Sequence, residues 1–268
     1  MSRPSNERYT HGHHESVLRS HSWRTIANSA AYLEPHLRPG LKILDVGCGP
    51  GTITAELADR VGREGSVVGL DASADVIAQA SETMARDNLH YMVGDVYALD
   101  VDHDSFDVVH AHQVLQHLAD PVAALVEMRR VCRPGGVIAA RDSDYPTMAW
   151  HPKPSEFDEW LALYSSVTRA NGGHPDAGRL LLSWAQQAGF DDITSSASAW
   201  CFATPSERDW WAGLWADRVV ESSLAEQAIS GGLASPDDLE RLSVAWRQWA
   251  AHDDGWFAML HGEILAVA

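Results

Sequence analysis

The sequence has few cysteines, few basic residues and no long apolar run, and each scarcity excludes a class of protein. Only three cysteines occur among 268 residues, and Cys48, Cys132 and Cys201 are far apart. Their odd number and wide spacing fit neither a disulfide framework nor a zinc-ligand pattern, so we expect a reducing, cytoplasmic setting. No stretch reaches the roughly 18 apolar residues of a membrane span, and no basic region followed by an apolar run indicates a signal peptide.

Acidic residues outnumber basic ones by 37 to 20, which gives a formal net charge of −17. A surface of this sign repels phosphate backbones, so nucleic acid is a poor partner and small neutral or cationic ligands are favoured. The charge says nothing about the fold. The hydrophobic content of 45% indicates a folded globular protein, because it suffices to bury a sizeable core in a chain of this length.

Short apolar segments alternate with amphipathic segments in the first half of the chain. Strands are predicted over 42–46, 66–70, 89–93, 106–111 and 136–140, and helices over 52–61, 74–86 and 121–131. This alternation is typical of parallel βαβ units in a doubly wound α/β sheet. Ligands of such sheets bind at the carboxyl ends of the strands.

The segments before and after this core differ from it in amino-acid composition. Residues 1–14 are polar and His-rich, and residues 15–36 have helical spacing. After Asp142 prolines cluster around Trp150, and ten of the eleven tryptophans lie at or beyond that position. Helices are predicted over 156–169, 176–188, 207–228 and 236–251, and a hairpin-like strand pair over 191–204. We therefore divide the chain into an N-terminal helical lid (1–38), a cofactor-binding core (39–145), and a region that holds the remaining core strands and a helical substrate cap (146–268).

The segment from Leu44 to Gly51, LDVGCGPG, follows a predicted strand and opens a predicted helix. Glycines in this context let backbone amides approach a ligand at the helix N-terminus. A dinucleotide fingerprint, G-x-G-x-x-G/A, requires glycine or alanine where Thr52 stands. Asp45 also occupies a strand position that is usually apolar in nicotinamide-binding proteins. The spacing therefore disfavours an NAD-dependent oxidoreductase.

The segment LDVGCGPG and the order of elements over residues 42–140 resemble the class I S-adenosylmethionine-dependent methyltransferases, in particular the branch that acts on quinones, sterols and natural products. The resemblance covers about the middle 40% of the chain. It implies a Rossmann-like seven-stranded sheet, mostly parallel with an antiparallel last strand, plus a helical cap. It also implies methyl transfer from S-adenosyl-L-methionine to a small acceptor, and the Trp-rich half favours a hydrophobic or aromatic one.

The resemblance assigns cofactor contacts to individual residues. Gly47 and Gly49 would line the methionine end of the cofactor, with Asp45 near its amino group. Asp71, in VVGLD, would accept charge-assisted hydrogen bonds from the ribose hydroxyls. The alternative role of Asp71 is to cap the N-terminus of the next helix. The other cofactor-binding residues implied are Ala72, Asp95, Val96, Ala111, His112 and Gln113 in the core, and Tyr9 and Arg24 in the N-terminal segment. For Arg24, a solvated helix face is the alternative.

Methyl transfer from a sulfonium is an in-line displacement, so aligning the reacting atoms in a dry pocket lowers most of the barrier. A hydroxyl nucleophile also benefits from a base, and a histidine suits that role. His117, in HQVLQHLADP, is our catalytic candidate, with Asp142 as the acidic partner that the resemblance implies. The alternative for His117 is that it caps or packs a helix.

The remaining predictions concern metal binding, partners and the alternative functions. The run that holds His11, His13 and His14 has no cysteine or acidic pair at zinc spacing, so we expect no metal. The predicted partner is a small-molecule acceptor, without nucleic acid or a membrane span, and a homodimer stays open. A non-methylating enzyme or a binding module that retains S-adenosylmethionine would carry the same core motifs, so this alternative also stays open.

Overall fold

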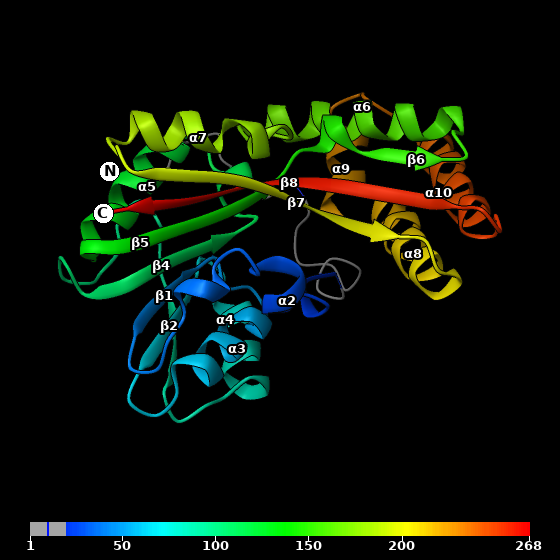
Figure 1. Ribbon diagram of the computed structural model, residues 1–268. Coiled ribbons are helices and arrows are strands. Elements are labelled where there is room, and N and C mark those ends of the chain that lie inside the picture. The colour runs from blue at the N-terminus through cyan, green and yellow to red at the C-terminus, as the bar shows by residue number, and fades with distance from the viewer. Residues whose placement is uncertain (1–9, 11–19) are drawn as a thin grey trace.

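The computed structural model describes residue 10 and residues 20–268, and a single curved sheet runs through this part of the chain (Figure 1). Its strands are β1 (Lys42–Val46), β2 (Ser66–Asp71), β3 (Leu89–Val93), β4 (Phe106–His112), β5 (Cys132–Ser143), β6 (Ala149–His151), β7 (Ile193–Phe202) and β8 (Trp256–Val267). The order is β3-β2-β1-β4-β5-β8-β6, and β7 also pairs with β8. Strands β1 to β5 are parallel and β8 is antiparallel to β5. The predicted fold class is confirmed.

Helices cover the sheet and build the second half of the chain. They are α2 (Ile26–Ser29), α3 (Thr52–Val61), α4 (Ala74–Thr83), α5 (Pro121–Val131), α6 (Ser155–Ala170), α7 (Ala177–Gln187), α8 (Pro205–Glu221), α9 (Ser223–Ser230) and α10 (Pro236–Ala250). Three of them begin with proline directly after a capping side chain, namely Asp120, Thr204 and Ser235. Proline is well suited to the first helical position, where an amide has no helical partner, so these dipeptides fix where α5, α8 and α10 start.

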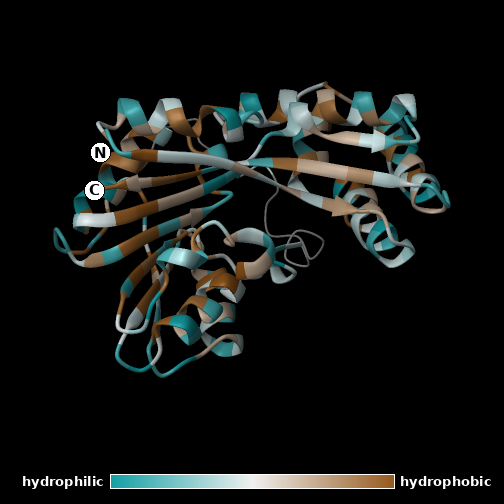
Figure 2. Ribbon diagram, viewed as in Figure 1, coloured by the Kyte–Doolittle hydropathy of each residue, from teal (hydrophilic) through white to brown (hydrophobic). Residues whose placement is uncertain are grey.

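Both faces of the parallel strands are buried. Leu44, Val109 and Ile138 pack with α5 and α7 in one cluster, whereas their neighbours Ile43 and Val108 pack against α2 and α3. Successive side chains of a strand point to opposite faces, so a run of apolar residues supplies both layers. Figure 2 shows these hydrophobic stretches along β4 and β5, while α6 and α7 alternate between hydrophobic and hydrophilic.

Strand β8 connects the parallel sheet to the cap. Its residues 261–267 pair with β5 and residues 256–258 pair with β6, while β7 follows its other edge over ten residue pairs. Figure 1 shows β7 and β8 running from the parallel strands out to α8 and α10. Beyond the parallel strands, a second cluster of buried aromatic side chains includes Phe157, Trp160, Trp215 and Trp246.

Three predicted elements differ from the structure. Where a hairpin is predicted over 191–204, residues 193–202 form the single strand β7, because β8 offers a partner over its full length. The helix predicted over 207–228 is broken at Ser222, which ends α8 and caps α9 by accepting from Leu224 N. In the N-terminal segment, Thr25 caps a new short helix, so the described part of 15–36 is not one continuous helix.

The aromatic cluster predicts a large stability cost for its central residue. Trp246 is fully buried, with its ring centroid 4.0 Å from that of Phe157 and 4.9 Å from that of Trp160. Trp246→Ala should lower the free energy of unfolding by about 3–5 kcal/mol because it leaves a cavity. Denaturant titration measures this, with Trp256→Ala, an exposed residue of β8, as the control that should cost about 1 kcal/mol or less. Equal losses in both variants would contradict the central role of the cluster.

Candidate functional site

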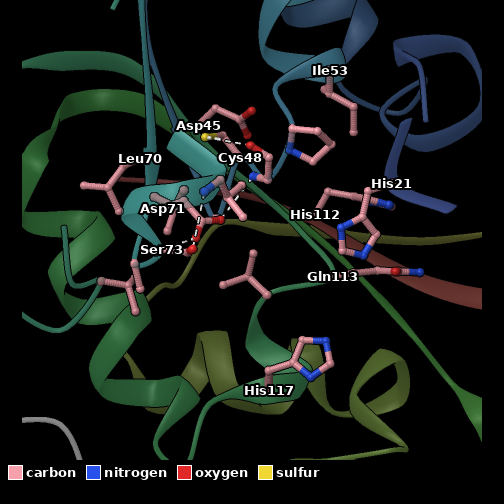
Figure 3. Close-up of a pocket in the computed structure, with 18 of the residues that line it drawn as sticks. His21, Asp45, Cys48, Ile53, Leu70, Asp71, Ser73, His112, Gln113 and His117 are labelled. Carbon is pink, nitrogen blue, oxygen red and sulfur yellow. Dashed lines mark hydrogen bonds between the residues drawn. The ribbon is translucent and has the colours of Figure 1, made fainter. Parts of the chain in front are cut away.

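A cavity of about 640 Å³ lies at the carboxyl ends of β1, β2 and β4, and its lining includes Val46, Asp71 and His112 (Figure 3). The strand order reverses between β1 and β4, and open α/β sheets bind ligands at such a reversal. The volume falls in the range of small-molecule sites. The cavity is therefore at the position that the predicted sheet requires.

The glycine-rich turn forms one wall of this cavity. Gly47, Gly49 and Gly51 have φ values of +64°, +54° and +84°, which side chains other than glycine rarely adopt. A Cβ atom at Gly47 would collide with Val114, and one at Gly51 would collide with the hydroxyl of Tyr91. Gly51 precedes α3 and supplies no side-chain cap, so no capping side chain competes with a ligand for the amides of the first turn.

Asp71 is held rigidly at the end of β2. Its Oδ2 accepts from Gly49 N at 3.1 Å, and its Oδ1 accepts from Ser73 N at 2.9 Å. Figure 3 shows these bonds next to the cavity. The N-cap of α4 is Ser73, whose hydroxyl accepts from Val76 N, so the alternative interpretation of Asp71 as the cap is wrong. The neighbours Ala72, Asp95 and Val96 line the same cavity.

Asp45 lines the cavity floor and is almost fully buried. His110 Nδ1 lies 2.7 Å from its Oδ1, and Thr54 Oγ1 donates to its Oδ2 at 2.6 Å. Sequence reasoning missed His110. The available signal was the pairing of β1 with β4, in which Asp45 and His110 are direct register partners. Paired in this way, the carboxylate has a fixed orientation.

Arg24 and Gln113 line the cavity and are hydrogen-bonded to each other. Gln113 has a φ of +54°, an unfavourable conformation for its residue type, directly after β4. Its Oε1 accepts from Arg24 Nη2, and its Nε2 lies 2.9 Å from Nε2 of His261 on β8. Arg24 is therefore part of the cavity wall and not of a solvated helix face. His261 was missed because no strand was predicted after residue 251.

Two histidines of the cavity are neutral. Burial, together with the positive charges of Arg24 and Arg141, lowers the pKa of His112 well below its usual range. Burial and the charge of Arg24 lower the pKa of His117 to about 3. His117 ends a short turn, Leu115–His117, and Figure 3 shows it well apart from Asp45 and Cys48 in the cavity. A base with so low a pKa holds a proton poorly at neutral pH.

A second, enclosed space adjoins the first and is mostly aromatic. Its volume is about 30 Å³, the size of a single water molecule. Four residues line both spaces, and they are His21, Arg24, Gln113 and His117. The other walls come mainly from the second half of the chain and include Tyr145, Trp200, Trp210, Trp211 and Trp215. The Trp-rich half therefore meets the first cavity along one shared boundary.

Two of the expected site residues that the structure describes are not on these walls. Asp142 is fully buried, and its Oδ1 accepts from Gln116 N at 3.1 Å, so it supports the turn before His117 and does not reach either space. Ala111 is buried beneath the cavity. Both belong to strands whose alternate side chains point away from the ligand. Tyr9 lies outside the described residues, as do His11, His13 and His14.

Burial raises the pKa of Asp142 to about 8. Its folded state therefore binds a proton more tightly than the unfolded chain, so stability contributed by this proton is present at low pH and falls as the pH rises from about 4 to about 8. Between pH 5 and pH 8, wild type should lose more free energy of unfolding than Asp142→Asn, measured by denaturant titration. The exposed Asp191→Asn should follow wild type. Parallel pH profiles for all three proteins would contradict the raised pKa.

The described residues hold neither a metal-binding cluster nor a membrane-spanning helix. No group of three or more His, Cys, Asp or Glu side chains in this part of the chain is arranged to hold a metal ion. Among the helices that the structure describes, none combines the length and apolarity needed to cross a membrane.

Comparison with known proteins gave one consistent family. The sequence profile of a methyltransferase domain matches residues 37–197. An uncharacterized methyltransferase of Schizosaccharomyces pombe is 36% identical over 99% of this chain and 98% of its own. The Aspergillus luteorubrus protein named probable methyltransferase ltbC is 27% identical over 96% of each. Haemonchus contortus phosphoethanolamine N-methyltransferase 2, solved with phosphomonomethylethanolamine and S-adenosylhomocysteine, has a TM-score of 0.53 at 21% identity and covers 89% of this chain and 52% of that one. This last likeness concerns the fold.

Proposed function

The chain belongs to the S-adenosylmethionine-dependent methyltransferases, and we propose that it transfers the methyl group to a small hydrophobic or aromatic acceptor. The observation that carries this proposal is the boundary of His21, Arg24, Gln113 and His117, which the donor cavity shares with the tryptophan-lined space. An acceptor that lies in the larger cavity against that boundary would meet the donor there. Residues that belong to both spaces are placed to touch both molecules.

The donor cavity fits S-adenosyl-L-methionine. The glycine wall leaves room where a Cβ would intrude, and the uncapped amides of α3 favour a ligand with negative or carboxylate groups. In the proposal, Gly47 and Gly49 line the methionine end, and Asp45 stands near its amino group. Asp71 accepts from the ribose hydroxyls, and Asp95 and the Val96 amide contact the adenine. Asp71 suits this role because Gly49 and Ser73 already fix its carboxylate.

The acceptor side would work by position and by exclusion of water. Bound S-adenosylmethionine supplies an electrophilic methyl group on a sulfonium. Aromatic rings pack closely around the second space: Trp23 and Trp210 have centroids 5.1 Å apart, and Trp200 and His261 have centroids 4.3 Å apart. Rigid aromatic rings at this boundary would hold a flat acceptor in one orientation and help to exclude water from the reacting atoms. In this proposal, the segment around Arg24 and the cap helix α8 close the site over the acceptor.

The decisive experiment is transfer from methyl-labelled S-adenosylmethionine to a panel of phenols, quinols and aliphatic amines. We expect labelled product with the aromatic acceptors. Trp210→Ala should raise the acceptor KM several-fold while calorimetric affinity for the donor stays unchanged, because Trp210 lines only the second space. Donor binding without transfer to any member of the panel or of a cell extract would instead favour a non-methylating enzyme or binding module.

Donor binding itself has a separate test in Asp71. Asp71→Ala should weaken calorimetric affinity for S-adenosylmethionine by roughly 1.5–3 kcal/mol, because charge-assisted hydrogen bonds are lost. The control is Asp75→Ala, an exposed acid four residues away that does not line the cavity. Unchanged affinity in a folded Asp71→Ala protein would remove this carboxylate from the donor site.

A further inference from the structure

We propose that Trp200 is a positioning residue. It fixes Arg24 and Gln113, two residues of the boundary that the donor cavity shares with the aromatic space. A buried ion pair of Arg141 and Glu263 in turn fixes Trp200. The inference rests on the proposed function for its effect on methyl transfer, whereas the positioning of the boundary residues is a property of the protein alone.

Trp200, near the end of β7, is 6% exposed and holds the N-terminal segment at two points. Its indole N–H donates to the backbone O of Asn28 at 2.6 Å. The guanidinium carbon of Arg24 lies 5.9 Å from its ring centroid, which is within the range of a cation–π contact. An indole combines a large aromatic face with one N–H donor, so a single side chain can make both contacts.

The same indole also contacts His261 of β8, and the two ring centroids are 4.3 Å apart. His261 Nε2 lies 2.9 Å from Gln113 Nε2, and Gln113 Oε1 accepts from Arg24 Nη2. A guanidinium only donates, so the amide oxygen of Gln113 must face Arg24. Each of these four side chains therefore contacts two of the others. A shift of Trp200 would move Arg24 and Gln113 together.

Gln113 depends on such contacts because its backbone is strained. Its φ of +54° is unfavourable for a residue with a side chain of this kind. A conformation of this type persists only where the surrounding structure holds it in place. The backbone N of Gln113 donates to Arg141 O at 2.7 Å, and its side chain is held by Arg24 and His261.

The ion pair next to Trp200 is almost completely buried, with exposures of 1% for Arg141 and 4% for Glu263. Arg141 Nε donates to Glu263 Oε1 at 3.2 Å, and the guanidinium carbon lies 5.1 Å from the Trp200 ring centroid. Ser198, two residues before Trp200, donates to Glu263 and accepts from Arg141. The pair therefore connects β5, β8 and β7 at the point where β7 presents Trp200 to the site.

Stability alone does not account for this ion pair. Two buried charges lose their hydration, so apolar residues of similar volume often give an equally stable protein. Removing only one partner is costly, because the other charge is then left buried and unpaired. The role of the pair is to orient Trp200, through the cation–π contact of Arg141 and through the hydrogen bonds of Ser198.

The consequence for methyl transfer concerns alignment. In-line displacement requires the nucleophile, the methyl carbon and the sulfur to be collinear, and a misplacement of about 1 Å can lower the rate about 10²-fold. Trp200 lines the aromatic space but not the donor cavity. A change at Trp200 should therefore lower kcat by disturbing the boundary, with little effect on donor binding.

Amide hydrogen exchange of the full-length protein with bound S-adenosylhomocysteine tests the positioning without an acceptor. Trp200→Phe keeps an aromatic ring but loses the N–H donor. Exchange over residues 20–30 and 113–117 should then rise about tenfold, while exchange in α5 should match that of the wild type. Unchanged exchange over residues 20–30, or a uniform rise over the whole chain, would overturn the proposal.

The ion pair is tested by Arg141→Met combined with Glu263→Gln, which removes both charges together. Exchange should rise over the same two segments, and adding Trp200→Phe should cause little further change, because the pair acts through Trp200. The matched control is Arg241→Met with Glu159→Gln, an exposed ion pair whose removal should leave exchange unchanged. Additive effects of the buried pair and Trp200→Phe would contradict the role of the pair.

The transfer assay then links position to rate. For a phenol that the wild type methylates, Trp200→Phe should lower kcat about tenfold, with the acceptor KM and the calorimetric affinity for S-adenosylhomocysteine within about twofold of wild type. An unchanged kcat would overturn the inference and leave the proposed function intact. If the wild type binds its donor but methylates nothing, the proposed function fails, while hydrogen exchange still decides whether Trp200 positions the boundary.

Discussion

Strand β8 is the constraint on which the rest of the site depends. It pairs with β5 through residues 261–267 and with β7 along its whole other edge, so one hydrogen-bonded ladder spans the donor-binding sheet and the aromatic cap. The same strand places His261 Nε2 2.9 Å from Gln113 Nε2, and the His261 ring centroid lies 4.3 Å from that of Trp200. The cavity built by the first half of the chain and the wall built by the second half therefore meet at a fixed separation. A flexible linker between two domains would not position a methyl group and its acceptor in this way.

Several buried titratable groups near the site favour their uncharged forms, although the protein as a whole is strongly acidic. His112, His117 and His261 all have lowered pKa values because they are buried near arginines, and Asp142 has a raised one because it is buried. A buried group that gives up its charge avoids most of the desolvation cost. Asp45 is also buried, but each of its carboxylate oxygens has a hydrogen-bond partner, namely His110 for Oδ1 and Thr54 for Oδ2.

The sequence predicts the donor half well and the acceptor half poorly, for a physical reason. Elements from 42 to 131 have strong apolar periodicity and glycine boundaries, and several have the predicted ends, such as α3 and α5. The glycine-rich turn that lines the donor cavity is one contiguous segment, so its sequence motif is enough to predict its geometry. Strand β7 has mostly exposed small residues, and β8 alternates buried polar residues such as His261 and Glu263 with apolar ones, so neither gives a simple pattern. Asp142 was expected at the acceptor, and only the strand register shows that its side chain supports a turn instead.

The same limit explains why Gln116 escaped sequence reasoning. Gln116 stands beside His117, but its hydrogen-bond partners are distant in the sequence. Ser143 and Asp142 are 27 and 26 positions away, and His174 is on a third segment. These contacts exist only when β5 and the turn after β4 are packed together. A histidine read alone suggests a base, because its unperturbed pKa is near neutral. In the folded protein, burial and the charge of Arg24 lower the pKa of His117 to about 3, and this shift depends on segments that are far apart in the sequence.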